Sequence, residues 1–244
     1  TARADREQLI ASITRIEYPG GDNTLLNSFF VQLERASSSA EPLRILHYGD
    51  SQIEGDRMTS FIRFKLQEKF GGSGIGMQPL VQLYGYQLSL KQKASEGWSR
   101  YTAFGKVDST LGHNRYGALA CFTRFTPYPD SLGLMDPGLS SGQAWITLEQ
   151  SRRAYRISRN FQNCRLFYGN ATDPVYFEVW ADGELYDADF LEPSSGLREK
   201  SWGFEEAPVE LSFRFKSACS PDFYGMSLDP DWGLSVDNIP MRGS

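Results

Sequence analysis

The stretch from Leu43 to Phe70 constrains the fold of this chain more than any other. An apolar run, Leu43 to Tyr48, is typical of a short buried strand, and it stops at Gly49. From Gln52 to Phe70 apolar residues recur at helical spacing, and the basic residues mostly fall away from them. The apolar residues are Met58, Phe61, Ile62, Leu66 and Phe70; the basic ones are Arg57, Arg63, Lys65 and Lys69. The sequence therefore predicts a strand followed directly by a helix, as at the start of an α/β layered domain.

Ser51 lies at the junction between the predicted strand and the predicted helix. Such a position is at the carboxyl edge of a sheet, where open α/β folds bind ligands. The start of the following helix offers unpaired backbone N–H groups and a partial positive charge, which suit an oxyanion formed during acyl transfer. Ser51 is therefore a candidate nucleophile. The alternative is that Ser51 only caps the helix, because serine is a favoured N-cap residue.

Helical patterns precede this unit and strand patterns follow it. Residues 6–16 and residues 25–36 carry apolar side chains at helical spacing. From about Leu80 to Val236 short strand patterns recur between Gly, Pro and Asp turns, and Asp182-Gly183 marks a hairpin. The predicted strands are 118–125, 144–148, 165–168, 175–181 and 209–216. Many short strands of this kind predict a β-sandwich.

The residues "GDSQIEGD" resemble the first sequence block, Gly-Asp-Ser-x-x-x-Gly, of the SGNH (GDSL) hydrolase family. Gly49, Asp50, Ser51 and Gly55 all match this block, and they lie in the expected context of a strand before and a helix after. The resemblance implies a flavodoxin-like α/β/α sandwich and esterase or acetylesterase chemistry on lipids or acylated glycans. It assigns the nucleophile to Ser51, gives Asp50 a supporting place in the motif, and places the Ser51 backbone N–H in the oxyanion hole.

The last residues, "GLSVDNIPMRGS", resemble the family's second block, a glycine often preceded by an asparagine. On this likeness Gly243 is the expected second oxyanion donor. The chain then divides into the N-terminal part of a hydrolase domain (1–80), an inserted β-sandwich (81–235) and a return to the hydrolase domain (236–244). This order is similar to that of peptidoglycan O-acetylesterases, in which the insert looks like a carbohydrate-binding module. The expected fold class is a partial α/β/α sandwich with a large all-β insert.

The resemblance implies a serine esterase that removes O-acetyl groups from a cell-wall or other polysaccharide. The expected partner is an acylated polysaccharide or peptidoglycan, the expected location is periplasmic or secreted with the signal peptide removed, and neither a cofactor nor a metal is expected. A hypothesis from another class is a non-catalytic glycan-binding protein built on a degenerate esterase scaffold.

The family's catalytic base is missing from the sequence. An oxyanion-hole asparagine and an Asp-x-x-His, which carries the base and its orienter, should follow Gly243, but the chain ends at Ser244. Neither His47 nor His113 has an aspartate three residues before it. We expect His47 to be a packing or supporting residue of its strand and His113 to be exposed in a loop. The sequence thus predicts the N-terminal portion of a longer protein, which alone should be a poor esterase.

Composition argues against several other classes. The net charge of −5 disfavours nucleic acid as the main partner, and no apolar run approaches the length of a membrane-spanning helix. The three cysteines fit no zinc spacing and lie in strand-like runs, which favours small buried residues. They are Cys121, Cys164 and Cys219.

Three further motifs have ordinary interpretations. Glycine-rich residues 71–79 follow a helix and not a strand, which indicates a flexible active-site loop or a turn in place of a dinucleotide site. Asp229 and Asp231 lack further oxygen ligands in register, so a solvated turn is favoured over a calcium site. A basic cluster, interpreted as a solvated face or as a contact for an acidic glycan, comprises Arg152, Arg153, Arg156 and Arg159.

Overall fold

The computed structural model describes residues 17–39, 41–109, 111–127 and 142–243. The chain forms two units, Thr1–Arg35 and Ala36–Ser244, which we describe separately. The first contains a short 3-10 turn, Pro19–Gly21, and most of helix α2, Asn27–Ala36. This helix begins two residues after the predicted position. The helix predicted over residues 6–16 lies outside the described residues.

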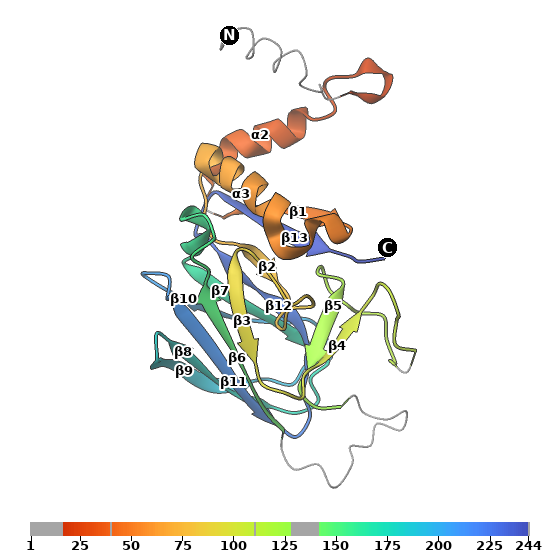
Figure 1. The fold of residues 1–244 in the computed structure, drawn as a ribbon, viewed down its shortest axis with the longest axis vertical. Coiled ribbons are helices and arrows are strands. Elements are labelled where there is room, and N and C mark those ends of the chain that lie inside the picture. The colour runs from red at the N-terminus through yellow and green to blue at the C-terminus, as the bar shows by residue number, and fades with distance from the viewer. Residues whose placement is uncertain (1–16, 40, 110, 128–141, 244) are drawn as a thin grey trace. The chain divides into compact units, whose positions relative to one another are not determined.

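In the larger unit, β1 (Leu43–Gly49) and β13 (Leu234–Pro240) pair in parallel, with Gly49 opposite Pro240. Helix α3 (Arg57–Phe70) lies along this pair (Figure 1). This is the strand-and-helix unit that the sequence predicted, extended by one strand from the far end of the chain. Among the described residues it is the single parallel pair, so most of the unit is antiparallel β structure.

Two antiparallel sheets make up the rest of the unit (Figure 1). One sheet has the strand order β10-β7-β12-β5-β4, with β2 also paired to β12. Its strands are β2 (Gly76–Gln78), β4 (Ser99–Thr102), β5 (Cys121–Arg124), β7 (Asn163–Gly169), β10 (Arg198–Gly203) and β12 (Asp222–Asp229). The other sheet has the order β3-β6-β11-β8-β9. Its strands are β3 (Leu90–Ala94), β6 (Gly142–Gln150), β8 (Val175–Ala181), β9 (Glu184–Leu191) and β11 (Glu210–Ser217).

The two sheets share one hydrophobic core. In β11, Leu211, Phe213 and Phe215 are buried, as the predicted period of two requires. The residues between them are exposed or half-buried. The six-stranded sheet contributes Leu166, Phe223 and Met226 to the same core. The three cysteines are free and buried, which confirms the prediction made for them.

The segment after Ser51 departs from the predicted continuous helix. Residues Ser51–Asp56 form a 3-10 turn, here called the Ser51 turn, and α3 begins only at Arg57. The interruption falls at Gly55, whose φ of 75° is accessible to glycine and costly for most other residues. Asp56 also has a positive φ of 61°, so the chain changes direction before the helix starts.

Helix α3 turns its polar face, not its apolar stripe, toward β13. Arg63 and Gln67 are buried, and they donate hydrogen bonds to the carbonyl oxygens of Val236 (2.7 Å) and Leu234 (3.0 Å). In contrast, the predicted apolar stripe is largely exposed, for example 52% at Phe61. Periodicity alone assigns the apolar face to the core. Here hydrogen bonds to the strand backbone stabilise the opposite orientation.

The glycine-rich segment and Asp229 also differ from prediction. Gly72 has a φ of 102°, and a Cβ there would lie 2.3 Å from the Leu234 backbone nitrogen, so this segment is a tightly packed connection. Asp229 is buried and paired with Arg44 and Arg165, at 2.5 and 2.6 Å. It therefore belongs to neither a solvated turn nor a calcium site, and no metal-ligand cluster exists among the described residues. In the same part of the chain no helix is long and apolar enough to cross a membrane.

Candidate functional site

The Ser51 turn starts at the carboxyl end of β1, and Asp50 caps it. The Asp50 carboxylate accepts a hydrogen bond from the Gln52 backbone N–H at 2.8 Å. Ser51 is therefore not the N-cap, which removes the alternative interpretation of this serine. Its side chain is exposed and has no hydrogen-bond partner among the described residues. The Ser51 hydroxyl is thus accessible to a ligand.

Close packing explains why both of these motif positions, Gly49 and Gly55, are glycine. A Cβ at Gly49 would lie 3.0 Å from Cδ1 of Ile53, so a larger residue would push the Ser51 turn away from β1. A Cβ at Gly55 would lie 3.3 Å from the Tyr86 ring, and the Gly55 carbonyl accepts a hydrogen bond from Leu88 N–H at 2.9 Å. These glycines let the turn pack against its own strand and against the segment that precedes β3.

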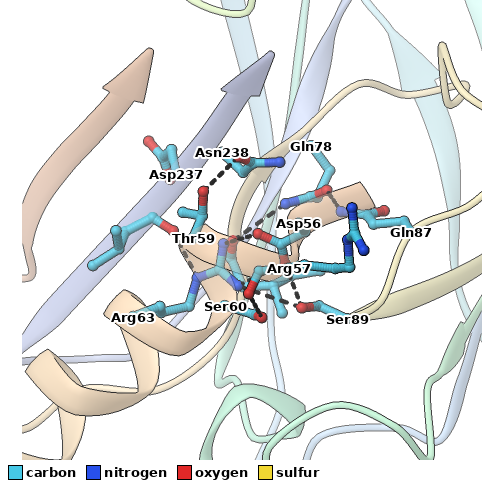
Figure 2. Close-up of polar contacts among 12 residues, drawn as sticks. Asp56, Arg57, Thr59, Ser60, Arg63, Gln78, Gln87, Ser89, Asp237 and Asn238 are labelled. Atoms are coloured by element: carbon cyan, nitrogen blue, oxygen red, sulfur yellow. Dashed lines mark hydrogen bonds and ion pairs between the residues drawn. The ribbon is translucent and has the colours of Figure 1, made fainter. Parts of the chain in front are cut away.

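A buried ion pair holds the C-terminal end of the Ser51 turn (Figure 2). Arg63 and Asp56 are both fully buried, and Arg63 Nη1 lies 2.9 Å from Asp56 Oδ2. The Ser89 hydroxyl donates to the same carboxylate. Arg63 also reaches the Val236 carbonyl, so one guanidinium connects the turn, the segment before β3, and β13. A buried charge needs partners of this kind to be tolerated.

A second buried network connects β1, α3 and β13. The Thr59 hydroxyl donates to Asn238 Oδ1 at 2.6 Å, and Asn238 Nδ2 donates to the Ile53 carbonyl of the Ser51 turn at 3.1 Å. His47 Nδ1 lies 2.9 Å from Thr59 Oγ1. Because the Thr59 proton is directed to Asn238, His47 Nδ1 acts as the donor. His47 therefore has the supporting role that we expected.

Asn238 was not among the residues predicted to act at the site. The signal for it was present, because it lies before Gly243 in the stretch that resembles the second block. Sequence reasoning offered it no partner, since its contacts are made by residues nearly the whole chain away. In the structure it orients the turn that carries Ser51.

The residues that follow β13 also contact the Ser51 turn. Met241 N–H donates to the Gly49 carbonyl at 2.8 Å, and Arg242 Nε donates to Glu54 Oε1 at 2.6 Å. The Arg242 guanidinium lies 5.2 Å from the Tyr84 ring centroid. Gly243 follows directly, exposed and with a φ of 78°. The pairing thus brings the two sequence blocks to the same end of β1 and β13, while a hydrogen bond from Gly243 to an oxyanion stays a prediction.

Two buried carboxylates fasten the other end of β1. Arg44 lies 2.6 Å from Asp237 on β13 and also pairs with Asp229 on β12. Burial acts to raise the pKa of both carboxyls. At Asp229 the opposing effect of Arg44 and Arg165 is larger, so the pKa of this carboxyl lies below its ordinary value. For Asp237 burial outweighs Arg44, and its pKa lies above the ordinary value. This cluster joins the parallel pair to the six-stranded sheet.

The prediction for His113 was wrong. Its side chain is only 8% exposed, and its Nε2 lies 2.8 Å from Asp222 Oδ2. Arg124 pairs with the other oxygen of Asp222 at 2.7 Å. A fully buried aspartate requires such partners, which the loop pattern around His113 did not reveal. Neither histidine of the chain belongs to an Asp-x-x-His.

Comparisons with known proteins place the fold. No family model matches the chain. No curated protein matches it either. A solved structure titled "Peptidoglycan O-acetylesterase in action, 5 min" is similar, with a TM-score of 0.55 and 18% identity, covering 88% of this chain. Most of this chain shares its fold with part of that esterase. The chain spans 52% of the esterase's length, and at this identity the likeness concerns the fold alone.

Two carbohydrate-binding modules from Clostridium thermocellum also match, at lower similarity. The family 35 module has a TM-score of 0.31 and 10% identity, covering 57% of this chain and 96% of its own. The family 11 module, in complex with a mixed-linked tetrasaccharide, has a TM-score of 0.29 and 11% identity, covering 68% and 99%.

Proposed function

We propose that this chain carries the nucleophile of an SGNH-type serine esterase that removes O-acetyl groups from a polysaccharide such as peptidoglycan. The observation that carries the proposal is the exposed Ser51 hydroxyl at the carboxyl end of β1, which has no hydrogen-bond partner in the described part of the chain and lies on a turn already capped by Asp50. The fold shared with a peptidoglycan O-acetylesterase supports it. A cell-wall substrate requires a periplasmic or secreted location, which is part of the proposal.

In the proposed reaction Ser51 Oγ attacks the carbonyl carbon of the acetyl ester. Its proton passes to a general base, and the negative charge on the carbonyl oxygen is stabilised by the backbone N–H groups of Ser51 and Gly243. The sugar hydroxyl leaves with the proton, and water then releases acetate from the serine. No Asp-x-x-His occurs among the 244 residues, so the base is not assigned to a residue of this chain.

Acetate release from O-acetylated peptidoglycan tests the proposal directly. In the full-length gene product, Ser51→Ala should lower the rate about a thousandfold or more, because a missing nucleophile cannot be replaced by its neighbours. Ser201→Ala is the matched control, since Ser201 is exposed on β10, away from the Ser51 turn. Retained turnover in Ser51→Ala would remove this residue from the nucleophile role.

The outer face of the five-stranded sheet favours a second candidate, a glycan-binding protein without catalysis. Trp145 on β6 is 42% exposed and Phe190 on β9 is 50% exposed. Trp180 and Tyr176 lie between them on β8, with Arg214 over the Trp180 ring at 4.6 Å. Flat aromatic faces beside hydrogen-bonding groups suit sugar rings. Glycan binding without Ser51-dependent acetate release would favour this candidate.

A further inference from the structure

A cleft of about 960 Å³ opens where β3 and β4 meet the segments that follow β2 and β6. Its cationic residues are Lys91, Arg100, Arg152 and Arg153, and Glu96 is its one acidic lining residue. The chain as a whole has a net charge of −5. The cations of the cleft attract an anionic ligand, whereas the acidic surface around the cleft repels it. The cleft is therefore the place where an anionic ligand is expected to bind.

The three arginines of the cleft have charges that the described part of the protein does not neutralise. Neither Arg100, Arg152 nor Arg153 forms an ion pair with any described residue. Guanidinium groups match the geometry of a carboxylate, to which they donate two parallel hydrogen bonds. The basic cluster seen in the sequence therefore divides, since Arg152 and Arg153 line this cleft while Arg156 and Arg159 line another cavity.

The remaining wall of the cleft is polar and fixed. Gln82 donates to Gln87 at 2.6 Å, and its backbone N–H donates to Gln92 at 2.6 Å. Gln92 in turn donates to the Leu80 carbonyl at 2.7 Å. These amides lie beside the rings of Trp98 and Tyr86. Preordered amides next to aromatic rings suit a hydroxylated ring better than an extended apolar segment.

The cleft shares part of its wall with a smaller pocket beside the Ser51 turn. Residues Gln82, Tyr84, Tyr86 and Gln87 line both the cleft and a smaller pocket formed with Gly55, Asn238 and Pro240. Tyr86 packs directly on Gly55, within the Ser51 turn. Tyr86 thus lines the cleft on one side and contacts the turn that carries Ser51 on the other.

We propose that this cleft binds a glycan that bears carboxylate groups, with Arg100, Arg152 and Arg153 contacting the carboxylates. Within the proposed esterase, on which this inference rests, the cleft selects acidic glycans and aligns their acyl esters toward Ser51. Neutral polysaccharides lack the group that these arginines recognise. Binding should weaken at high ionic strength, because the arginines are exposed to solvent.

Binding to purified peptidoglycan sacculi tests this inference, with a second sample whose free carboxylates have been converted to amides. The protein should bind the native sacculi about five- to tenfold more tightly than the amidated ones, from two to three charge contacts. The double variant Arg152→Gln/Arg153→Gln should lose most of this difference. Its matched control, Arg198→Gln/Lys69→Gln, removes the same charge from exposed positions on β10 and α3 and should keep it.

Equal binding to native and amidated sacculi, or equal losses in both double variants, would overturn the inference. Ser51→Ala separates it from the proposed function, because that variant should bind both samples as the parent does. If acetate release depends on Ser51 but native and amidated sacculi bind equally well, the proposed esterase function is supported and the cleft proposal is wrong. If the protein prefers native sacculi but acetate release does not depend on Ser51, the cleft proposal is supported and the assignment of Ser51 as nucleophile is wrong.

Discussion

Replacing Arg63 by methionine should severely destabilise the larger unit. Arg63 and Asp56 are both fully buried, so Arg63→Met leaves the Asp56 carboxylate in a protein interior without its cation. Breaking a buried pair in this way costs about 3–5 kcal/mol of the free energy of unfolding. For a protein of this size the loss corresponds to a fall of about 6–20 °C in Tm. Urea denaturation followed by tryptophan fluorescence measures it.

Two further variants test whether the loss of stability in Arg63→Met comes from the buried ion pair. Lys65→Met removes a cation from the same helix, but Lys65 is 53% exposed and its ion pair is with exposed Glu68, so its cost should stay below about 0.5 kcal/mol. Asp56→Asn/Arg63→Met removes the buried charge together with its partner and should be more stable than Arg63→Met alone. A loss below about 1 kcal/mol for Arg63→Met, or no recovery in the double variant, would refute this reasoning.

Two other expectations concern buried chemistry and close packing. Burial raises the pKa of the Cys121 thiol to about 12, and the other two cysteines are buried as well. At about pH 8 the Cys121 thiolate is therefore scarce, and because all three thiols are buried, a thiol reagent should label no cysteine of the native protein but all three after denaturation; rapid native labelling would contradict this. Gly72→Ala should cost more than about 2 kcal/mol, because its Cβ meets the Leu234 backbone at 2.3 Å. Gly97→Ala has a similar positive φ of 88° and nothing within 4 Å, so strain alone should cost about 1 kcal/mol; equal losses in urea denaturation would show that packing at Gly72 is unimportant.

The sequence predicted the local elements of the fold well and their pairing only in part. Alternating side chains identified β11, and the hairpin signal at Asp182-Gly183 lies between β8 and β9, because both depend on neighbours in the chain. The pairing of β1 with β13 required a resemblance to the second sequence block, since no local pattern joins residues so far apart.

At the candidate site, too, the sequence predicted the local motif but not the contacts of its polar residues. The motif identified Ser51 and Asp50, but the assignment of the cap to Asp50 and not to Ser51 depended on the geometry of one backbone N–H. The face of α3 was misjudged because helical periodicity counts apolar residues and ignores hydrogen bonds to a neighbouring strand. His113 was misjudged because its partner, Asp222, lies on a distant strand.

The β structure also fixes the position of the Ser51 turn. The Ser51 turn is fixed by Arg63 from its own helix, by Ser89 from the segment before β3, and by Asn238 from β13. All three follow the turn in sequence, two of them beyond the end of α3, and each makes a contact that the turn itself cannot replace. Since buried polar groups are costly when a partner is missing, the turn keeps its geometry only when β13 and the segment before β3 are in place. The position of the candidate nucleophile therefore depends on the folding of the sheets as well as on the motif that carries it.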